Sequence, residues 1–411
     1  MKNRIFAATL ALAVLLTSSG CQVKHVQDVT VPDETLVPEK TISTLRVRYC
    51  DETYTKYLEY CKENYEKEHD NVEVILELAD SESYINNIND DSQDTNRVPD
   101  VYITDNSNLG TLYLAGLAAK NKSDKFVTDN YCDTALNACS YNGSLIAYPL
   151  GYETCFMVYN ADYLKEDDVK NFASLEAYAD EADFTSESDA SIETIFRGDL
   201  NEMFMNYGYI GNGIDVGGIY GEDTTKLSIN NDTTVKCARE YVALIDYFSL
   251  STDYSYYSIV KKFCSGNILS AIVRTSSIPS IAKSNINYKF AKFPDYSDDI
   301  KTTPLSITSA IVVNPYSVSS DAQNFAEYAS YGNADELYNY TGIPSAMKNA
   351  SYDNEKISDV YDSYTKSMPK NKAQYGEQVY PLLEIAMHNI AAGEDSSSEL
   401  QSVEDYMKKQ F

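Results

Sequence analysis

The side chains best suited to chemistry in this sequence are its carboxylates and its tyrosines. The chain has 62 Asp and Glu residues and 36 Tyr residues, and it has no Trp. A carboxylate accepts strong, charge-assisted hydrogen bonds from hydroxyl groups. A tyrosine ring offers a flat apolar face with a polar tip, so any aromatic recognition must use Tyr or Phe.

Motifs for catalysis are missing from the sequence. The three histidines, His25, His69 and His388, lie far apart, and there is no HExxH, CxxC or GxSxG motif. Metal-dependent hydrolysis and Ser–His catalysis therefore have no support. A glycosidase-like carboxylate pair stays open, because acids are plentiful and no one pair stands out. We expect a binding protein with no catalytic residue, no metal and no cofactor.

Eight cysteines are present, and we expect most of them to be buried free thiols. Cys132 and Cys139 fall seven positions apart on a predicted helix, which separates them by about 10 Å, beyond the reach of a disulfide. Cys50 and Cys61 could pair only if the first strand and helix pack closely.

Length and charge limit the class of protein. A chain of 411 residues exceeds one hydrophobic core and predicts two domains. The formal net charge of −29 repels nucleic acid and anionic lipid, and no basic patch relieves it. We therefore expect no nucleic-acid partner.

The N-terminus has the pattern of a secretion signal over residues 1–20. Lys2 and Arg4 precede an apolar run at 5–16, and small residues lead up to Cys21. This arrangement resembles a lipoprotein cleavage site, which implies that Cys21 is acylated. The alternative is a plain signal peptide followed by a chance cysteine. Residues 21–43 would then form a tether to the outer face of the bacterial cell membrane.

Strands and helices alternate after the tether. Strands are predicted at 45–49, 72–78 and 98–104, with a helix between the first two. In open α/β sheets, ligands collect beyond the carboxyl ends of the strands. The loops that follow the first and third strands supply these candidate ligand-binding residues: Asp51, Glu52, Tyr54, Thr104, Ser107 and Asn108.

A stretch at 141–164 organises the middle of the chain. Asn142-Gly143 predicts a tight turn, because both residues tolerate a positive φ. The polar and aromatic segment 151–154 lies between two predicted strands. The first is a short strand at 145–150 that is stopped by Pro149, and the second is at 156–159. This segment is typical of a chain that crosses between two lobes. A surface loop between two strands of one sheet remains the alternative.

The rest of the chain gives the remaining elements. Helices are predicted at 174–180, 192–207, 235–248 and 321–331, and strands at 268–273 and 307–313. Ser396 and Glu399 form a capping box for the last helix.

The segments YNGSLIAYP (141–149) and YNADYL (159–164) resemble the maltose/maltodextrin-binding proteins and related carbohydrate receptors of bacterial ABC importers. The resemblance implies an α/β, type II periplasmic-binding-protein-like fold, with two lobes and a ligand cleft between them. The lobes expected are 44–151 with 307–352, and 156–302 with 356–411. Crossings between them are expected at 152–155 and 303–306.

The resemblance also implies ligand contacts. Tyr152 and Glu153 fall at the crossing, where the family uses a hinge glutamate on sugar hydroxyls. Further contacts are implied at Glu202, Phe204, Arg274, Ser276, Tyr380 and Glu384. Ser276 replaces an expected Trp, and Thr104, Ser107 and Asn108 replace a Trp, an Asp and an Arg. These departures imply a pocket different from one that holds maltodextrin.

The function expected is a monomeric, lipid-anchored binding protein that captures a sugar or oligosaccharide and delivers it to ABC permease subunits. One alternative is the same fold binding a cationic solute such as a polyamine, or a peptide. Others are a secreted glycan-active enzyme and a surface adhesin or sensor.

Overall fold

The structure is a computed structural model that describes residues 42–184 and 191–411. The predicted signal peptide, Cys21 and the tether up to residue 41 lie outside the described residues. Residues 42–411 form one compact unit. Within the described ranges, no helix has both the length and the apolar character needed to cross a bilayer.

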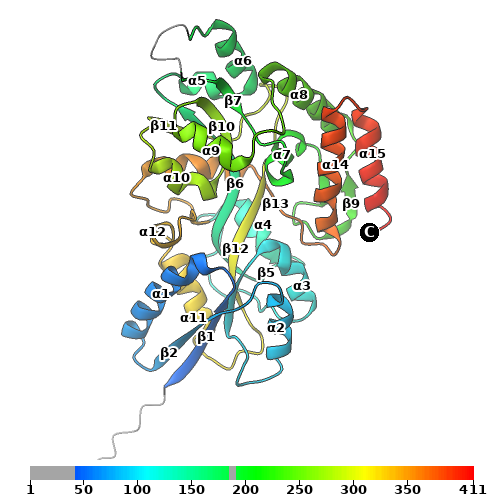
Figure 1. The fold of residues 1–411 in the computed structure, drawn as a ribbon. Helices are drawn as coiled ribbons and strands as arrows, with labels where there is room; N and C mark the ends of the chain where they lie inside the picture. The colour runs from blue at the N-terminus through cyan, green and yellow to red at the C-terminus, as the bar shows by residue number, and fades with distance from the viewer. Residues whose placement is uncertain (1–41, 185–190) are drawn as a thin grey trace, which may run out of the picture. The chain divides into compact units, whose positions relative to one another are not determined.

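A mixed sheet runs through this unit (Figure 1) in the strand order β2-β1-β3-β12-β6-β10-β7, with β11 paired to β6 and β13 to β12. β1 is parallel to β2 and β3, whereas β12 is antiparallel to both β3 and β6. The strands are β1 (Ser43–Tyr49), β2 (Val72–Leu78), β3 (Val101–Asp105), β6 (Tyr148–Asn160), β7 (Thr194–Arg197), β10 (Ile268–Arg274), β11 (Tyr288–Ala291), β12 (Leu305–Val313) and β13 (Met368–Pro369). Two short hairpins are formed by β4 (Ser140–Tyr141) with β5 (Ser144–Leu145), and by β8 (Asp215–Gly217) with β9 (Asp223–Ser228).

β6 changes partners part-way along its length. Its first part pairs with β12 as far as Thr154, and its second part pairs with β10 from Cys155 onward. In Figure 1, β6 and β12 run together from the half that holds α1 into the half that holds α8 and α14. These two strands therefore link the two halves of the sheet.

The prediction of two strands separated by a loop at 151–154 is wrong, because β6 is continuous. Pro149 lies inside it, opposite Ala310, where the register of β12 shifts. Proline is tolerated at such an irregularity because no regular ladder bond is lost there. Gly151 is required by close packing, since a Cβ there would lie 2.7 Å from Ile343 Cγ2. Most of the segment is buried, so the alternative of an exposed surface loop is also wrong.

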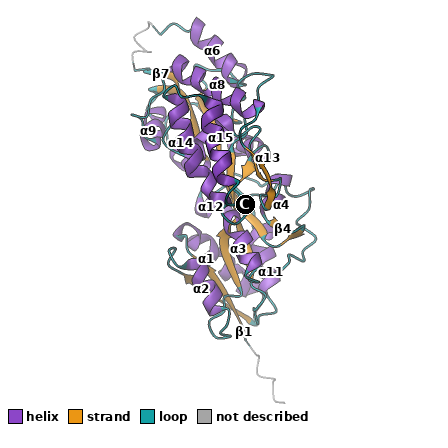
Figure 2. Cartoon of the chain, turned by 90° about the vertical axis from the view of Figure 1, so that its right-hand side faces the viewer, coloured by secondary structure: helices purple, strands orange, loops and turns teal. Residues whose placement is uncertain are grey.

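Helices cover the sheet (Figures 1 and 2), and α8, α14 and α15 pack against one another. The α-helices are α1 (Thr55–Glu68), α2 (Tyr84–Asp91), α3 (Leu109–Leu114), α4 (Asp133–Ala138), α5 (Glu166–Val169), α6 (Phe172–Glu181), α7 (Met203–Ile210), α8 (Asp232–Phe248), α9 (Tyr256–Cys264), α10 (Ile278–Ala282), α11 (Ala322–Glu327), α12 (Leu337–Thr341), α13 (Tyr361–Thr365), α14 (Val379–Ala391) and α15 (Ser396–Met407). The helix predicted between the first two strands is confirmed as α1, whose apolar face buries Tyr57, Leu58, Cys61 and Tyr65. The predicted strands and helices at 72–78, 174–180, 235–248, 268–273 and 307–313 are also confirmed.

Two local predictions are corrected. The segment at 192–207 holds strand β7 and the start of α7 rather than one helix, because β7 pairs with β10 far along the chain. The cap of α15 is Asp395, whose carboxylate accepts from the Ser398 N–H at 2.9 Å, rather than Ser396. The helix predicted at 321–331 is confirmed, as α11 continued by a π-helix at Tyr328–Gly332.

The thiol prediction is confirmed for the described residues. All seven described cysteines are free; five are buried, and Cys50 and Cys264 are half-buried. Burial raises the pKa of the Cys61 thiol to about 12, which keeps it protonated and unreactive at neutral pH.

Candidate functional site

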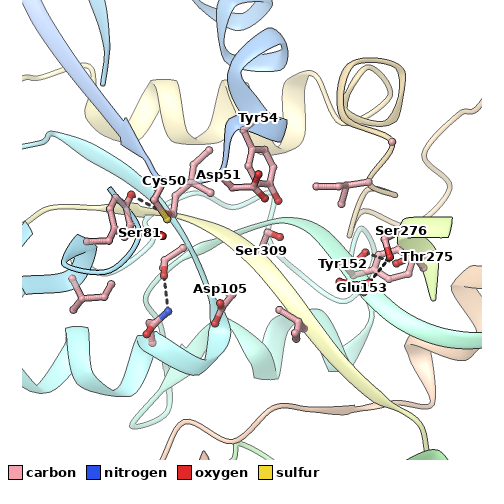
Figure 3. Close-up of a pocket in the computed structure, with 18 residues that line it drawn as sticks. Cys50, Asp51, Tyr54, Ser81, Asp105, Tyr152, Glu153, Thr275, Ser276 and Ser309 are labelled. Atoms are coloured by element: carbon pink, nitrogen blue, oxygen red, sulfur yellow. Dashed lines mark hydrogen bonds between the residues drawn. The ribbon is translucent and has the colours of Figure 1, made fainter. Parts of the chain in front are cut away.

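A cavity of about 360 Å³ lies where the carboxyl ends of β1 and β3 approach the middle of β6 (Figure 3). Residues distant in sequence meet there. They are Cys50, Asp51, Tyr54, Ser81, Tyr84, Ile85, Ile103, Thr104, Asp105, Asn108, Tyr152, Glu153, Thr275, Ser276, Ile307, Ser309, Gly342 and Ile343. The size suits a small solute rather than a macromolecule.

One side of the cavity, the first wall, consists of Asp51, Tyr54, Thr104, Asp105 and Asn108 on the loops that follow β1 and β3. Each loop is a short 3₁₀ turn capped by its own aspartate. Asp51 Oδ1 accepts from the Thr53 N–H at 2.9 Å, and Asp105 Oδ1 accepts from the Ser107 N–H at 2.8 Å. Local caps therefore place both carboxylates at the strand ends.

The opposite side is lined by Glu153 and Ser276. These two residues, together with Arg274 and Glu202, which adjoin them outside the lining, are called the second wall. The Ser276 hydroxyl donates to Glu153 Oε1 at 2.8 Å, and Arg274 Nε lies 3.7 Å from the same oxygen. Arg274 Nη1 also donates to Glu202 Oε1 at 2.8 Å. Figure 3 shows Glu153 and Ser276 together on the side of the cavity away from Asp51.

Negative charge converges on the cavity from both walls. Burial raises the pKa of Tyr54, Ser309 opposes the rise through a hydrogen bond, and the charges of Asp51, Asp105 and Glu153 add to it. All three carboxylates thus act on one hydroxyl. None of the described residues that line the cavity is Lys, Arg or His.

Glu202 pairs with Arg274 and is surrounded by other acids. Burial raises its pKa above the usual value. Arg274 opposes this rise, and the carboxylates of Asp199, Glu153 and Glu384 reinforce it. The positive charge of Arg274 thus offsets part of the negative charge around Glu202.

Half of the predicted ligand-binding residues line the cavity, namely Asp51, Tyr54, Thr104, Asn108, Tyr152, Glu153 and Ser276. The side chain of Tyr152 faces the core: the residue is 1% exposed, and its ring stacks on Tyr364 with centroids 4.1 Å apart. Its ring face is therefore not open to a ligand. The Tyr54 and Tyr84 rings are also buried, so no tyrosine of the described lining offers an open face.

The other predicted residues lie outside the lining. Arg274, Glu202 and Phe204 adjoin it through Glu153, with the Arg274 guanidinium 5.9 Å from the Phe204 ring. Glu52 is exposed, and the Ser107 hydroxyl donates to Asp105 at 2.6 Å.

Tyr380 and Glu384 lie on α14, and neither lines the cavity. The Tyr380 hydroxyl accepts from the Asn371 N–H at 3.0 Å, which ties it to the neighbouring loop. The negative charge of Glu384 helps to raise the pKa of Glu202 in the second wall.

Several lining residues were not predicted. Asp105 had a usable signal, since an aspartate that follows a strand and precedes a helix is a typical N-cap. Ser81, Ser309, Gly342 and Ile343 carry no such signal, because tertiary folding alone brings them to the cavity. Across the described residues, no group of three or more His, Cys, Asp or Glu is placed to hold a metal ion.

Residues 61–367 match the family model described as bacterial extracellular solute-binding protein. The chain belongs to this family. A curated member of similar sequence is the maltodextrin-binding protein MdxE of Bacillus subtilis (strain 168), which is 25% identical over 363 residues, covering 84% of this chain and 85% of that protein. The predicted membership in the solute-binding receptors is thus confirmed.

Solved structures show the same fold for this solute-binding protein. The extracellular solute-binding protein of Staphylococcus aureus, in complex with maltose, has a TM-score of 0.78 and 18% identity, with coverage of 90% of this chain and 98% of that one. The maltose-binding protein MalE of Listeria monocytogenes, also with maltose, has a TM-score of 0.74 and 21% identity, with coverage of 89% and 97%. The predicted two-lobe α/β fold is confirmed.

Proposed function

We propose that this protein captures a sugar or oligosaccharide in the cavity and delivers it to the permease subunits of an ABC importer. The cavity carries the proposal: it brings acceptor groups from two walls together around a space of about 360 Å³. Carboxylates on both walls and the amide of Asn108 on the first wall suit the hydroxyls of a sugar. The family and the maltodextrin-binding relative support this assignment.

We assign the lobes as residues 44–151 with 307–352, and 156–302 with 356–411. The change of β6 partners between Thr154 and Cys155 supports a crossing at 152–155. The second crossing, at 303–306, contains the start of β12, where Ser306 pairs with Thr154. Closure about these two adjacent strands would bring the walls onto the solute, in the manner of hinged binding proteins.

Within the cavity, Glu153, Asp51 and Asp105 accept hydrogen bonds from solute hydroxyls, while Thr104, Asn108 and Ser276 set its orientation. Glu153 is central because it is the carboxylate that lies on the linking strand itself. The protein performs no covalent step, and it acts as a monomer.

Cys21 is proposed as the lipidated N-terminus, which holds the protein on the outer face of the membrane. The membership in an extracellular family supports this assignment. Replacement of Cys21 by Ala should release the protein into the culture medium of cells that express it. Retention of the Cys21→Ala protein on the membrane would contradict the assignment.

A cationic solute such as a polyamine is the second candidate. The described lining contains three carboxylates, no basic side chain and no tyrosine with a face open to a sugar ring. A polyamine ammonium would pair with Asp51 and Asp105, because no cationic side chain of the described lining neutralises these two carboxylates.

A thermal-shift panel of maltose, maltotriose, glucosamine, spermidine and a short peptide separates these candidates. A solute present at about 100 times its Kd should raise the unfolding free energy by about 2.7 kcal/mol. A shift with a sugar that is lost in Glu153→Gln supports the first proposal. A shift confined to spermidine would replace it with the second, and glycan turnover lost in Glu153→Gln would show an enzyme instead.

A further inference from the structure

Arg274 links the carboxylates of the second wall. It ends strand β10, and Nη1 reaches Glu202, which is 72 residues earlier in the chain. Its Nε faces Glu153 at 3.7 Å, and the side chain is 26% exposed. One guanidinium therefore serves two acids that come from different elements.

Aromatic contacts fix the guanidinium itself. Its central carbon lies 4.8 Å from the centroid of the Tyr256 ring and 5.9 Å from that of Phe204. The Arg274 N–H also donates to the Tyr256 hydroxyl at 2.9 Å, so backbone and side chain are both held. Such cation–π contacts favour one placement of the charge. They also cover ring faces on which a sugar could stack.

We propose that Arg274 is a positioning residue that orients Glu153 toward the cavity and keeps it apart from Glu202. Arg274 does not line the cavity, so it acts through these two carboxylates rather than on the solute. The binding arm of this proposal rests on the proposed function. The planar fork of an arginine can serve two carboxylates at once, which the point charge of a lysine cannot.

The acidic residues around Glu202 explain why a cation is needed beside it. Asp199 precedes α7, Glu153 lies on β6 and Glu384 on α14, and all three are acids that act on Glu202. Without Arg274, these charges would repel Glu202 unopposed. The Glu202 carboxylate would then turn away or take up a proton, and Glu153 would lose one of its two contacts.

The test compares Arg274→Gln and Arg274→Lys with wild type in the full chain. Arg46→Gln is the matched control, because Arg46 also donates to a glutamate, Glu77, at 2.8 Å with a similar exposure of 30%. Unlike Glu153, Glu77 does not line the cavity. One measurement needs no ligand: the titration of Glu202 by NMR of protein labelled at the glutamate carboxyl carbons, assigned with Glu202→Gln. The other is calorimetric binding of maltose and of spermidine at about pH 7 and about pH 5.

We expect Glu202 to titrate at a higher pH in Arg274→Gln than in wild type. Binding of the recognised probe should weaken by about tenfold or more, and further at the lower pH. Arg274→Lys should restore the titration of Glu202, because the charge returns, but not the affinity, because the fork is lost. Arg46→Gln should change neither.

An unchanged Glu202 titration in Arg274→Gln would overturn the proposal, as would an affinity fully restored by Lys. If Arg274→Gln does not fold, by circular dichroism, Arg274→Lys decides alone: weakened binding supports the positioning role, and unchanged binding overturns it. If wild type binds neither probe, that result counts against the proposed function, and the ligand-free titration still decides the role of Arg274.

Discussion

The two walls of the cavity are built in different ways. In the first wall, Asp51 and Asp105 are held by donors two residues away, within their own turns. In the second wall, Glu153 is held by Ser276, 123 residues away, and by Arg274. A locally capped carboxylate is independent of its neighbours, whereas a shared cation couples its partners. Substitutions in the first wall should therefore act one at a time, and those in the second should depend on one another.

The largest effect should come from the support behind the second wall. Tyr152 precedes Glu153 and stacks on Tyr364, and Tyr152→Ala would leave a large void in the core. We expect unfolding free energy to fall by about 3–5 kcal/mol, measured by urea denaturation.

Tyr152→Phe is the control, because the buried Tyr152 hydroxyl has no hydrogen-bond partner among the residues that the structure describes. Its stability should match or exceed that of wild type. A large loss in this variant would mean that the hydroxyl has a partner, and that the ring is not the main contribution.

The next effect concerns the loops of the first wall. Asp51→Ala and Asp105→Ala each remove a cap and should each cost about 0.5–2 kcal/mol of unfolding free energy. Asp→Asn at the same positions keeps a capping oxygen and should cost only a few tenths. If Asn costs as much as Ala in urea denaturation, the negative charge rather than the cap holds the loop.

The next effect is smaller, and it is the non-additivity of paired substitutions in unfolding free energy, which should differ between the walls. In a double-mutant cycle, Glu153→Gln with Arg274→Gln should be non-additive in unfolding free energy by about 0.5 kcal/mol or more. Asp51→Asn with Arg274→Gln, which crosses the cavity, should be additive within about 0.5 kcal/mol. Equal coupling in both cycles would remove the distinction between the walls.

The smallest effect is on the pH dependence of stability. The pKa of Glu202 is raised in the folded protein, so its ionised form opposes folding. Glu202 does not destabilise the folded protein at a pH below its unfolded-state pKa. The destabilisation grows as the pH rises and is complete above its folded-state pKa. The stability of Glu202→Gln relative to wild type should therefore increase from acid to neutral pH, measured by urea denaturation across that range. A decrease would contradict the cause assigned.

The same contrast between the walls explains what the sequence could predict. The Asn142-Gly143 turn is confirmed, with φ of 47° and 67°, because such a turn depends on neighbouring residues alone. The cap that Asp51 forms on its own turn is local in the same way. The strand at Thr194–Arg197 was missed because its pairing with β10 decides its conformation. Arg274 was expected to face a ligand. Its link to Glu153 and Glu202 depends on how β6, β10 and α7 assemble, which local patterns do not encode.

The capture of a solute between the walls is tested most directly by calorimetric titration of wild type, Asp105→Asn and Glu153→Gln with the solute that gives the largest thermal shift. We predict one-to-one, saturable binding to wild type that weakens in both variants, since each changes a different wall. Binding that survives both substitutions unchanged would contradict the placement of the solute in this cavity.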